Sequence, residues 1–221
     1  MSGRLAFVMI AVLLGAVSIS FVARSATETG FRFPVLHGAA APDTLDDFRN
    51  AWYSQQLDAL GEPALEKASD TTVYRFTWLR TFDHPISVRV TKTKSGAELV
   101  AKELDGQGGY EPGKLLRTEK RNLSTSQFQS LEDFTAAHGF WELPTLDDSR
   151  AGADGAQWIF EAAGQRYHFV DRWSPADGPV RAIGLRMLDL AGWEVHDLEI
   201  HQERSGQVSR RHAGGSQRSN G

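Results

Sequence analysis

The sequence VYRFTWLRTFDHPISVRV, residues 73–90, determines which class of fold this chain can adopt. Its side chains alternate with a period of two, so that Tyr74, Phe76 and Trp78 share one face of an extended strand. The tripeptide DHP at residues 83–85 interrupts the alternation with residues that favour a turn. The stretch therefore predicts a β-hairpin with an aromatic face.

A second hairpin and an edge strand follow in the sequence. Residues 86–93 keep the alternation, and Ser95 with Gly96 predicts a turn that joins them to a strand at residues 98–104. Residues 114–122 predict another strand, but their charges alternate too regularly for the centre of a sheet. We therefore expect this strand at the edge.

Residues 156–173 predict a further hairpin with a definite register. A two-residue turn at Ala163 and Gly164 would place Glu161 opposite Arg166, so that opposite charges pair across the strands. The same register puts four aromatic side chains on one face: Trp158, Phe160, Tyr167 and Phe169.

Three helices have clear start and stop signals. The first is predicted to begin at an N-cap, either Asp43 or Thr44. In the second, Ser124 and Gln127 have the spacing of a capping box, and the third begins at Pro179. Each helix is predicted to end at a glycine that can adopt a left-handed backbone: Gly61, Gly139 and Gly192.

The order helix, four strands, helix, hairpin, helix predicts an α+β fold, because it lacks regular βαβ alternation. We expect one domain, with a mostly antiparallel sheet of about five to six strands packed by three helices. The predicted organisation is an export segment at residues 1–25, a flexible tether at 26–42, the globular domain at 43–201 and a disordered basic tail at 202–221.

The N-terminal segment contains 19 uncharged residues, 5–23, between Arg4 and Arg24. This pattern is typical of an export signal. Ala23 and Ser25 have the spacing of a cleavage site, which favours a cleaved signal peptide, and the alternative is an uncleaved membrane anchor. In either case we expect the domain to face outward, in the periplasm or the extracellular space.

Composition excludes several classes of function. The chain has 221 residues and no cysteine, so disulfides, thiolate metal sites and cysteine nucleophiles are excluded. Residues 26–203 contain 18 Lys and Arg against 28 Asp and Glu, a net charge of −10. Such an acidic body would repel a phosphate backbone, so we expect no nucleic-acid partner.

Two places in the sequence could bind a ligand. Arg80, Asp83, His84 and Arg89 lie near the first predicted turn, where guanidinium groups, an imidazole and a carboxylate could bind an anion. The structural alternative is that Asp83 shapes the turn and the arginines cover apolar surface. Arg172 ends a predicted strand and could either clamp a ligand or lock a turn.

Other apparent motifs fail on spacing, so we expect neither a metal nor a cofactor. His196 and His201 flank Glu199, but a separation of five prevents the two histidines from binding one zinc ion in regular structure. The glycine-rich residues 105–113 are not followed by a helix that could bind phosphate. The acidic residues after Asp147 lack the glutamate of a calcium-binding loop.

The tryptophans have two interpretations. They could line a carbohydrate platform or a peptide groove, but their periodic placement beside Phe and Tyr is more typical of core packing. The six are Trp52, Trp78, Trp141, Trp158, Trp173 and Trp193.

The sequence therefore favours an exported accessory or binding protein of the cell envelope or extracellular space. Its partner would be a protein or an envelope component, with membrane contact through the N-terminal segment if that segment is uncleaved. The alternative is an unfamiliar hydrolase acting on envelope material, with His84 and Asp83 as its candidate acid–base groups.

Overall fold

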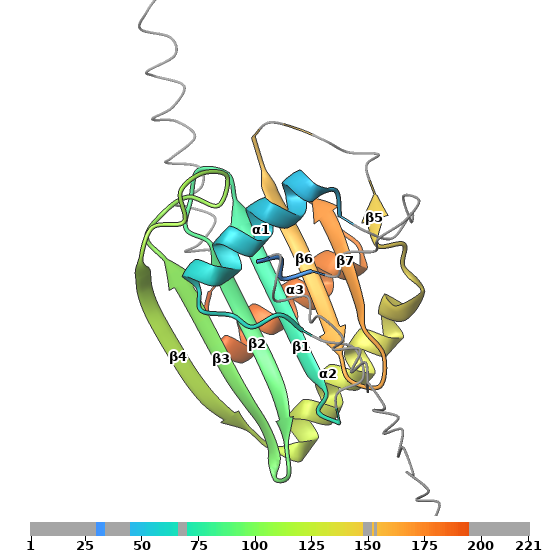
Figure 1. Cartoon of the computed structure of the whole chain (residues 1–221). Helices are drawn as coiled ribbons and strands as arrows, with labels where there is room; N and C mark the ends of the chain where they lie inside the picture. The colour runs from blue at the N-terminus through green and yellow to red at the C-terminus, as the bar shows by residue number, and fades with distance from the viewer. Residues whose placement is uncertain (1–29, 34–44, 66–69, 148–151, 153, 195–221) are drawn as a thin grey trace, which may run out of the picture.

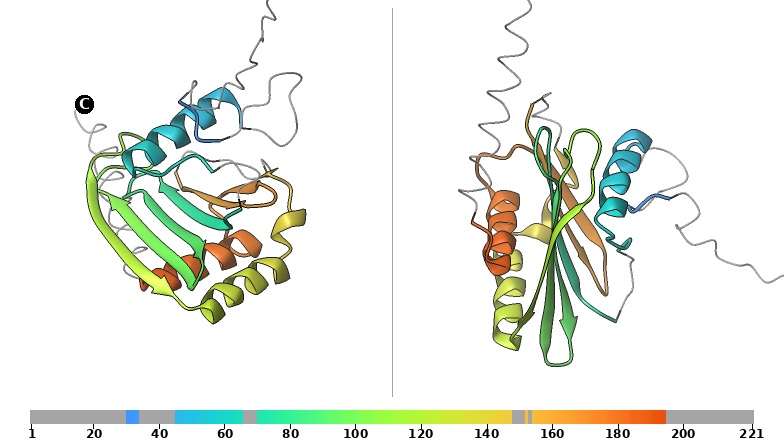
Figure 2. Two further views of the ribbon diagram at one scale, coloured as in Figure 1. Left: turned by 60° about the horizontal axis from the view of Figure 1, so that its bottom comes forward. Right: turned by 90° about the vertical axis from the view of Figure 1, so that its left-hand side faces the viewer.

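The computed structural model describes residues 30–33, 45–65, 70–147, 152 and 154–194. In this part of the chain, seven strands form one sheet in the order β4-β3-β2-β1-β6-β7-β5 (Figure 1). The helix α1 covers one face of the sheet, and α2 and α3 cover the other (Figure 2). The elements are α1 (Asp47–Ala59), β1 (Val73–Arg80), β2 (Ile86–Thr93), β3 (Gly96–Leu104), β4 (Leu115–Leu123), α2 (Thr125–Ala137), a 3₁₀ helix (Phe140–Glu142), β5 (Leu146–Asp147), β6 (Ala156–Ala163), β7 (His168–Trp173) and α3 (Pro179–Ala191).

The predicted α+β class and the three helices are confirmed, and the sheet has more strands than the five to six expected. The additional strand is β5, which has only two residues and pairs in parallel with β7. A two-residue strand has no periodic sequence pattern, so alternation could not predict it. The sheet is therefore mixed rather than purely antiparallel.

The first two hairpins form close to where they were predicted. The first turn lies between β1 and β2, with Trp78 paired with Ile86. The second turn consists of Lys94 and Ser95, one residue earlier than predicted, and Gly96 already pairs within β3. A Cβ atom on Gly96 would lie 2.1 Å from the carbonyl oxygen of Leu123, so the glycine permits a close backbone approach. The strand β4 lies at the edge, as predicted.

The register predicted for the β6–β7 hairpin is wrong. Glu161 pairs with Phe169 rather than with Arg166, and the connecting segment is residues 164–167. The pairing differs from the prediction by three residues, an odd number, so the side chains of β7 alternate onto the other faces. The four aromatics are consequently divided: Trp158 and Phe160 face α2 and α3, whereas Phe169, with Tyr167 packed beside it, faces α1.

The helix termini follow the predicted chemistry with one correction. In the capping box, the Gln127 amide N–H donates to Ser124 Oγ at 3.2 Å, and the Ser124 amide N–H donates to Gln127 Oε1 at 2.9 Å. The helix α3 begins at Pro179 and ends before Gly192. The N-cap of α1 is Asp46, whose carboxylate accepts from the Arg49 amide at 2.8 Å, and not Asp43 or Thr44. The prediction missed it because Asp46 is a third capping-type residue in the same short stretch.

The predicted segments outside the globular domain fall largely beyond the described residues. Within the expected tether, however, Phe33 is 1% exposed and packs against Tyr53 and Phe169. The side-chain amide of Asn50 donates to the Phe33 carbonyl oxygen at 3.2 Å. In the described part of the chain, no helix is long and apolar enough to span a membrane.

Candidate functional site

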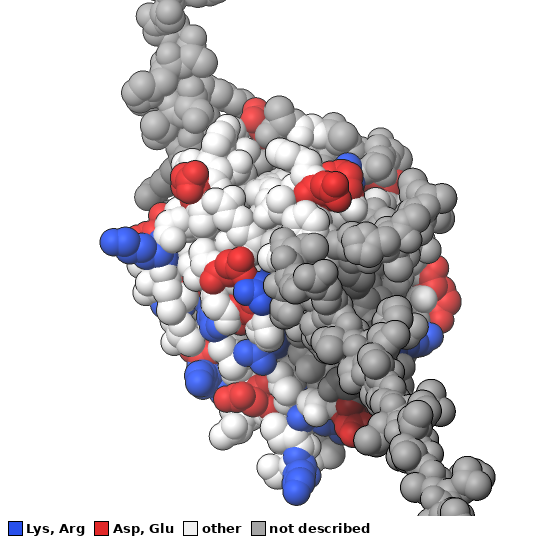
Figure 3. Space-filling view, viewed as in Figure 1, with Lys and Arg blue, Asp and Glu red and all other residues white. Residues whose placement is uncertain are grey.

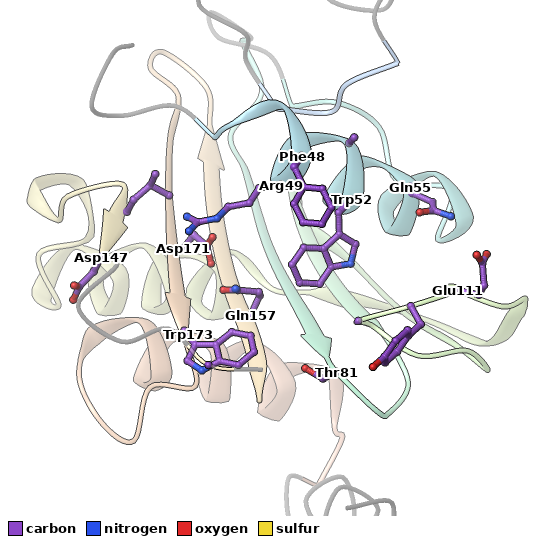
Figure 4. Close-up of a pocket in the computed structure, with 15 residues that line it drawn as sticks. Phe48, Arg49, Trp52, Gln55, Thr81, Glu111, Asp147, Gln157, Asp171 and Trp173 are labelled. Carbon is purple, nitrogen blue, oxygen red and sulfur yellow. The ribbon is translucent and has the colours of Figure 1, made fainter. Parts of the chain in front are cut away.

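A pocket of about 680 Å³ lies between α1, the neighbouring ends of β6 and β7, and the loop of residues 105–114 (Figure 4). Four of its lining residues are aromatic: Phe48, Trp52, Tyr110 and Trp173. The volume lies within the range of about 300–1,000 Å³ that is usual for small-molecule sites.

The helix α1 forms the first wall. Phe48, Trp52 and Gln55 are spaced four and three residues apart, so they lie on one face of the helix. The indole N–H of Trp52 donates to the carbonyl oxygen of Gly108 at 2.8 Å, which fixes the orientation of the ring. Phe48 lies 6.4 Å from Trp52, ring centre to ring centre, and is 76% exposed.

The glycine-rich loop forms the second wall. The Gly108 amide donates to the carbonyl oxygen of Arg80 at 2.8 Å, and a Cβ atom on Gly108 would lie 2.6 Å from the Arg80 backbone nitrogen. The glycine therefore allows the loop to lie directly against the end of β1. The carbonyl oxygen of Tyr110 accepts from Gln56 at 2.9 Å, so the same loop is also joined to α1. These contacts place the Tyr110 ring at the pocket rim.

The strands β6 and β7 form the floor. Gln157 pairs with Trp173 across the two strands, and both side chains line the pocket. Asp171 accepts a hydrogen bond of 2.8 Å from the hydroxyl of Tyr53, which ties α1 to the floor. Burial, and then the charge of Asp171, raise the pKa of Tyr53 far above its usual value. The Tyr53 hydroxyl therefore keeps its proton and serves as a structural donor.

The polar groups of the pocket are spread along it. The side-chain amides of Gln55 and Gln157 form no hydrogen bond within the described residues, so each is available to a ligand. Glu111 and Asp147 lie at opposite ends of the pocket (Figure 4). Among the described residues of the lining, Arg49 is the single basic one, against three acidic residues that include Asp171.

In the predicted anion site around the first turn, the charged groups contact one another and the turn backbone. The Arg80 guanidinium donates to Asp83 at 3.0 Å and to the His84 carbonyl oxygen at 2.7 Å, and it lies 3.7 Å from Glu103. The His84 amide donates to the other Asp83 oxygen at 2.7 Å. Burial lowers the pKa of Arg80, and the carboxylates of Asp83 and Glu103 oppose this shift. Arg80, Asp83 and His84 thus lock the turn together.

Arg89 and Arg172 do not join this group. Arg89, on β2, donates to the buried carboxylate of Glu62, three residues after the end of α1, at 2.8 Å. Arg172 donates to the carbonyl oxygens of Thr145 and Pro144 at 3.1 and 2.7 Å, and burial lowers its pKa. Arg172 lines a smaller hollow of about 290 Å³, and none of the five predicted residues lines the larger pocket.

The sequence analysis named the tryptophans that line the pocket, but it did not predict that they come together. Trp78, Trp158 and Trp193 lie in the apolar core, as periodic placement predicted. Trp52 and Trp173 lie outside that core cluster and line the pocket. No group of three potential metal ligands occurs among the described residues, and His196 and His201 lie outside them.

The chain was also compared with known proteins. Searches against protein-family models, curated proteins and solved structures give no significant match. The geometry and the chemistry of the pocket are therefore the basis for proposing a function.

Proposed function

We propose that this chain is an exported, non-enzymatic binding protein of the cell envelope or extracellular space, and that it binds its ligand in the pocket beside α1. The observation that carries the proposal is the pocket itself, with four aromatic rings and two unengaged amides around about 680 Å³. Aromatic walls with a few directed polar groups are the usual composition of a ligand site.

The contacts of the titratable groups support binding rather than hydrolysis. The Tyr53–Asp171 pair joins α1 to the sheet, so it acts as an anchor. A hydrolase based on His84 and Asp83 would need those groups at a pocket, within reach of a substrate. Asp83 instead accepts from Arg80 and from the turn backbone, and neither residue lines the two pockets described above.

The export part of the proposal is supported by the uncharged residues 5–23 between two arginines. Fractionation of the source cells followed by intact-mass measurement tests it. We expect the protein outside the cytoplasm with a mass that lacks residues 1–25. A mass that retains them would make the segment an anchor, and recovery of the protein from the cytoplasm would contradict export.

Ligand binding can be tested by thermal unfolding in the presence of a soluble envelope extract of the source organism. A ligand at about 100 times its Kd stabilises by about 2.7 kcal/mol, and each kcal/mol shifts Tm by about 2–4 °C in a chain of this size. We expect an upward shift of several degrees for the wild type and a smaller one for Phe48→Ala. An extract that shifts both proteins equally, or neither, would contradict binding in this pocket.

A further inference from the structure

We infer that the ligand of the α1 pocket is a neutral saccharide, an inference that rests on the proposed binding function. The observation that carries it is the placement of Trp52 on the α1 wall and Trp173 on the floor of the pocket, with the amide of Gln157 between the two rings (Figure 4). Both indole rings line the same hollow although they come from a helix and from a strand.

The aromatic rings match one side of a sugar. A pyranose ring has a face of C–H groups, which can pack on an indole, and a rim of hydroxyl groups, which must be hydrogen-bonded when buried. The Trp52 ring is held by its hydrogen bond to Gly108, so a sugar would meet a preformed surface. A preformed surface reduces the entropy lost on binding.

The polar groups match the other side of the sugar. A hydroxyl group both donates and accepts hydrogen bonds, and a primary amide offers both functions as well. Gln55 on α1 and Gln157 on β6 supply two such amides, without competing hydrogen bonds in the described part of the chain. An acyl chain would desolvate these amides without giving them partners, which is unfavourable.

The charges argue against an ionic ligand. Among the described lining residues there are one arginine and three carboxylates, which disfavours an anion. A compact cation would require carboxylates that converge on the aromatic rings. Asp171 is already hydrogen-bonded to Tyr53, and Glu111 and Asp147 lie at opposite ends of the pocket (Figure 4). Among the described residues, the surface around α1 likewise shows charged side chains that are separate from one another rather than gathered in one patch (Figure 3). A neutral, elongated ligand fits this distribution.

An array of immobilised neutral oligosaccharides, probed with the full chain, gives the first test. Calorimetric titration with the soluble form of the best binder then measures the effect of variants. We expect Trp173→Ala to weaken binding by about tenfold or more and Gln55→Ala by about threefold. Gln55 is exposed, so its variant remains informative if removal of an indole disturbs folding.

Trp141→Ala is the matched control, because Trp141 is half-buried like Trp173 but packs on the other side of the sheet. Its Kd should equal that of the wild type. Equal weakening by Trp141→Ala and Trp173→Ala would overturn the inference. Failure of every neutral oligosaccharide on the array to bind would overturn it as well.

Periodate treatment of the envelope extract separates the saccharide inference from the binding function, because periodate cleaves the vicinal diols of sugars. Loss of the thermal shift after this treatment supports a saccharide. A shift that survives periodate, but remains sensitive to Phe48→Ala, leaves the pocket function standing and overturns the saccharide. A shift that is insensitive to Phe48→Ala overturns both.

Discussion

The face of the sheet beneath α2 and α3 is filled mainly by apolar side chains, with the buried charges of Arg80 and Glu103 at one end. The face beneath α1 carries charged and hydroxyl groups among its apolar ones. Phe76, Trp158 and Phe160 pack on the first face. Arg75 and Glu161, their direct neighbours in sequence, lie on the second face and are fully buried there. Both faces exclude water, but they do so with different chemistry.

The charges on the α1 face are paired at short range. The Arg75 guanidinium lies 2.6 Å from Glu161, which also accepts from the Tyr167 hydroxyl at 2.9 Å. Burial raises the pKa of Glu161, and the charge of Arg75 opposes this shift. Glu62 is paired with Arg89 and Lys102, each at 2.8 Å.

Buried pairs of this kind add little net stability, because desolvation offsets their attraction. Apolar packing tolerates repacking, whereas a directed hydrogen bond requires its partner at one place. We therefore interpret the α2 and α3 face as the stabilising side. The α1 face holds the pocket wall in a fixed position, through contacts such as Tyr53–Asp171 and Trp52–Gly108.

The largest expected effects come from Phe160 and Glu161, neighbours that point to opposite faces. Phe160→Ala should destabilise by about 3–5 kcal/mol, because it leaves a cavity beside Tyr74 and Phe140. Glu161→Ala should cost a similar amount, about 3–5 kcal/mol, because it leaves the buried charge of Arg75 without its partner. Urea denaturation measures both. A loss below about 1 kcal/mol for Glu161→Ala would instead fit the cross-strand pair with Arg166 that the sequence predicted, because such a pair is weak when it is exposed.

On the α1 face, the stability lost in Glu161→Ala should be recoverable by further substitutions. Combining Arg75→Met, Glu161→Leu and Tyr167→Phe removes the buried polar cluster together with the desolvation it requires. We expect the triple variant to recover most of the loss caused by Glu161→Ala, to within about 1–2 kcal/mol of the wild type. Calorimetric unfolding of the single and triple variants checks this. If the triple variant recovers no stability, the buried polar cluster itself makes a net contribution to the stability of the fold.

At alkaline pH, ionisation of Tyr74 on the apolar face should cause a smaller loss of stability. Burial raises the pKa of Tyr74 to about 12. In the unfolded chain the tyrosine ionises near pH 10, so its stability contribution is complete below about pH 10 and is lost as the pH rises toward 12. Tyr74→Phe should remove this loss and gain about 2–3 kcal/mol relative to the wild type at pH 12. Denaturant melts of both proteins at pH 8, 10 and 11.5 measure this difference in the free energy of unfolding. A difference that does not change with pH would contradict the prediction.

At neutral pH the two buried tyrosines should behave differently. Tyr53→Phe removes the hydroxyl that donates to Asp171 and should cost about 1–3 kcal/mol, because a buried hydrogen bond to a carboxylate is lost. Tyr74→Phe should change stability by less than about 0.5 kcal/mol, since the Tyr74 hydroxyl makes no hydrogen bond within the described residues. Equal costs for the two variants would remove the distinction between the faces.

Local signals in the sequence predicted much of the fold. The capping box at Ser124, the start of α3 at Pro179 and the first hairpin depend on residues close together in the chain, and all three are present. The β6–β7 register failed for a physical reason. Residues 156–163 face a packed layer on both sides, so alternation of apolar and polar residues cannot identify the faces. Glu161 in particular is satisfied by Arg75, 86 residues away.

The pocket could not be predicted because its walls meet only in the folded chain. Tyr53 and Asp171, whose hydrogen bond joins the α1 wall to the floor, are 118 residues apart. The sequence did contain a weak signal in the glycines of residues 105–113, although these residues do not fit a phosphate loop. Their role is to let the backbone approach β1 and to place Tyr110 at the rim.

The smallest expected effect on stability belongs to Phe48, and it separates function from folding on the α1 side. Phe48 is 76% exposed, whereas Phe33 in the same layer is 1% exposed and packs on Tyr53 and Phe169. Phe48→Ala should change the free energy of unfolding by less than about 0.5 kcal/mol, because little contact is lost. Phe33→Ala should cost about 3–5 kcal/mol in the same urea melt. Because Phe48 also lines the pocket, the proposed binding function predicts that the variant retains the wild-type melt but shows a smaller extract-induced stabilisation. A loss of stability comparable to that of Phe33→Ala would mean that Phe48 is buried in solution. Its ring would then not be available to a ligand on the α1 wall of the pocket.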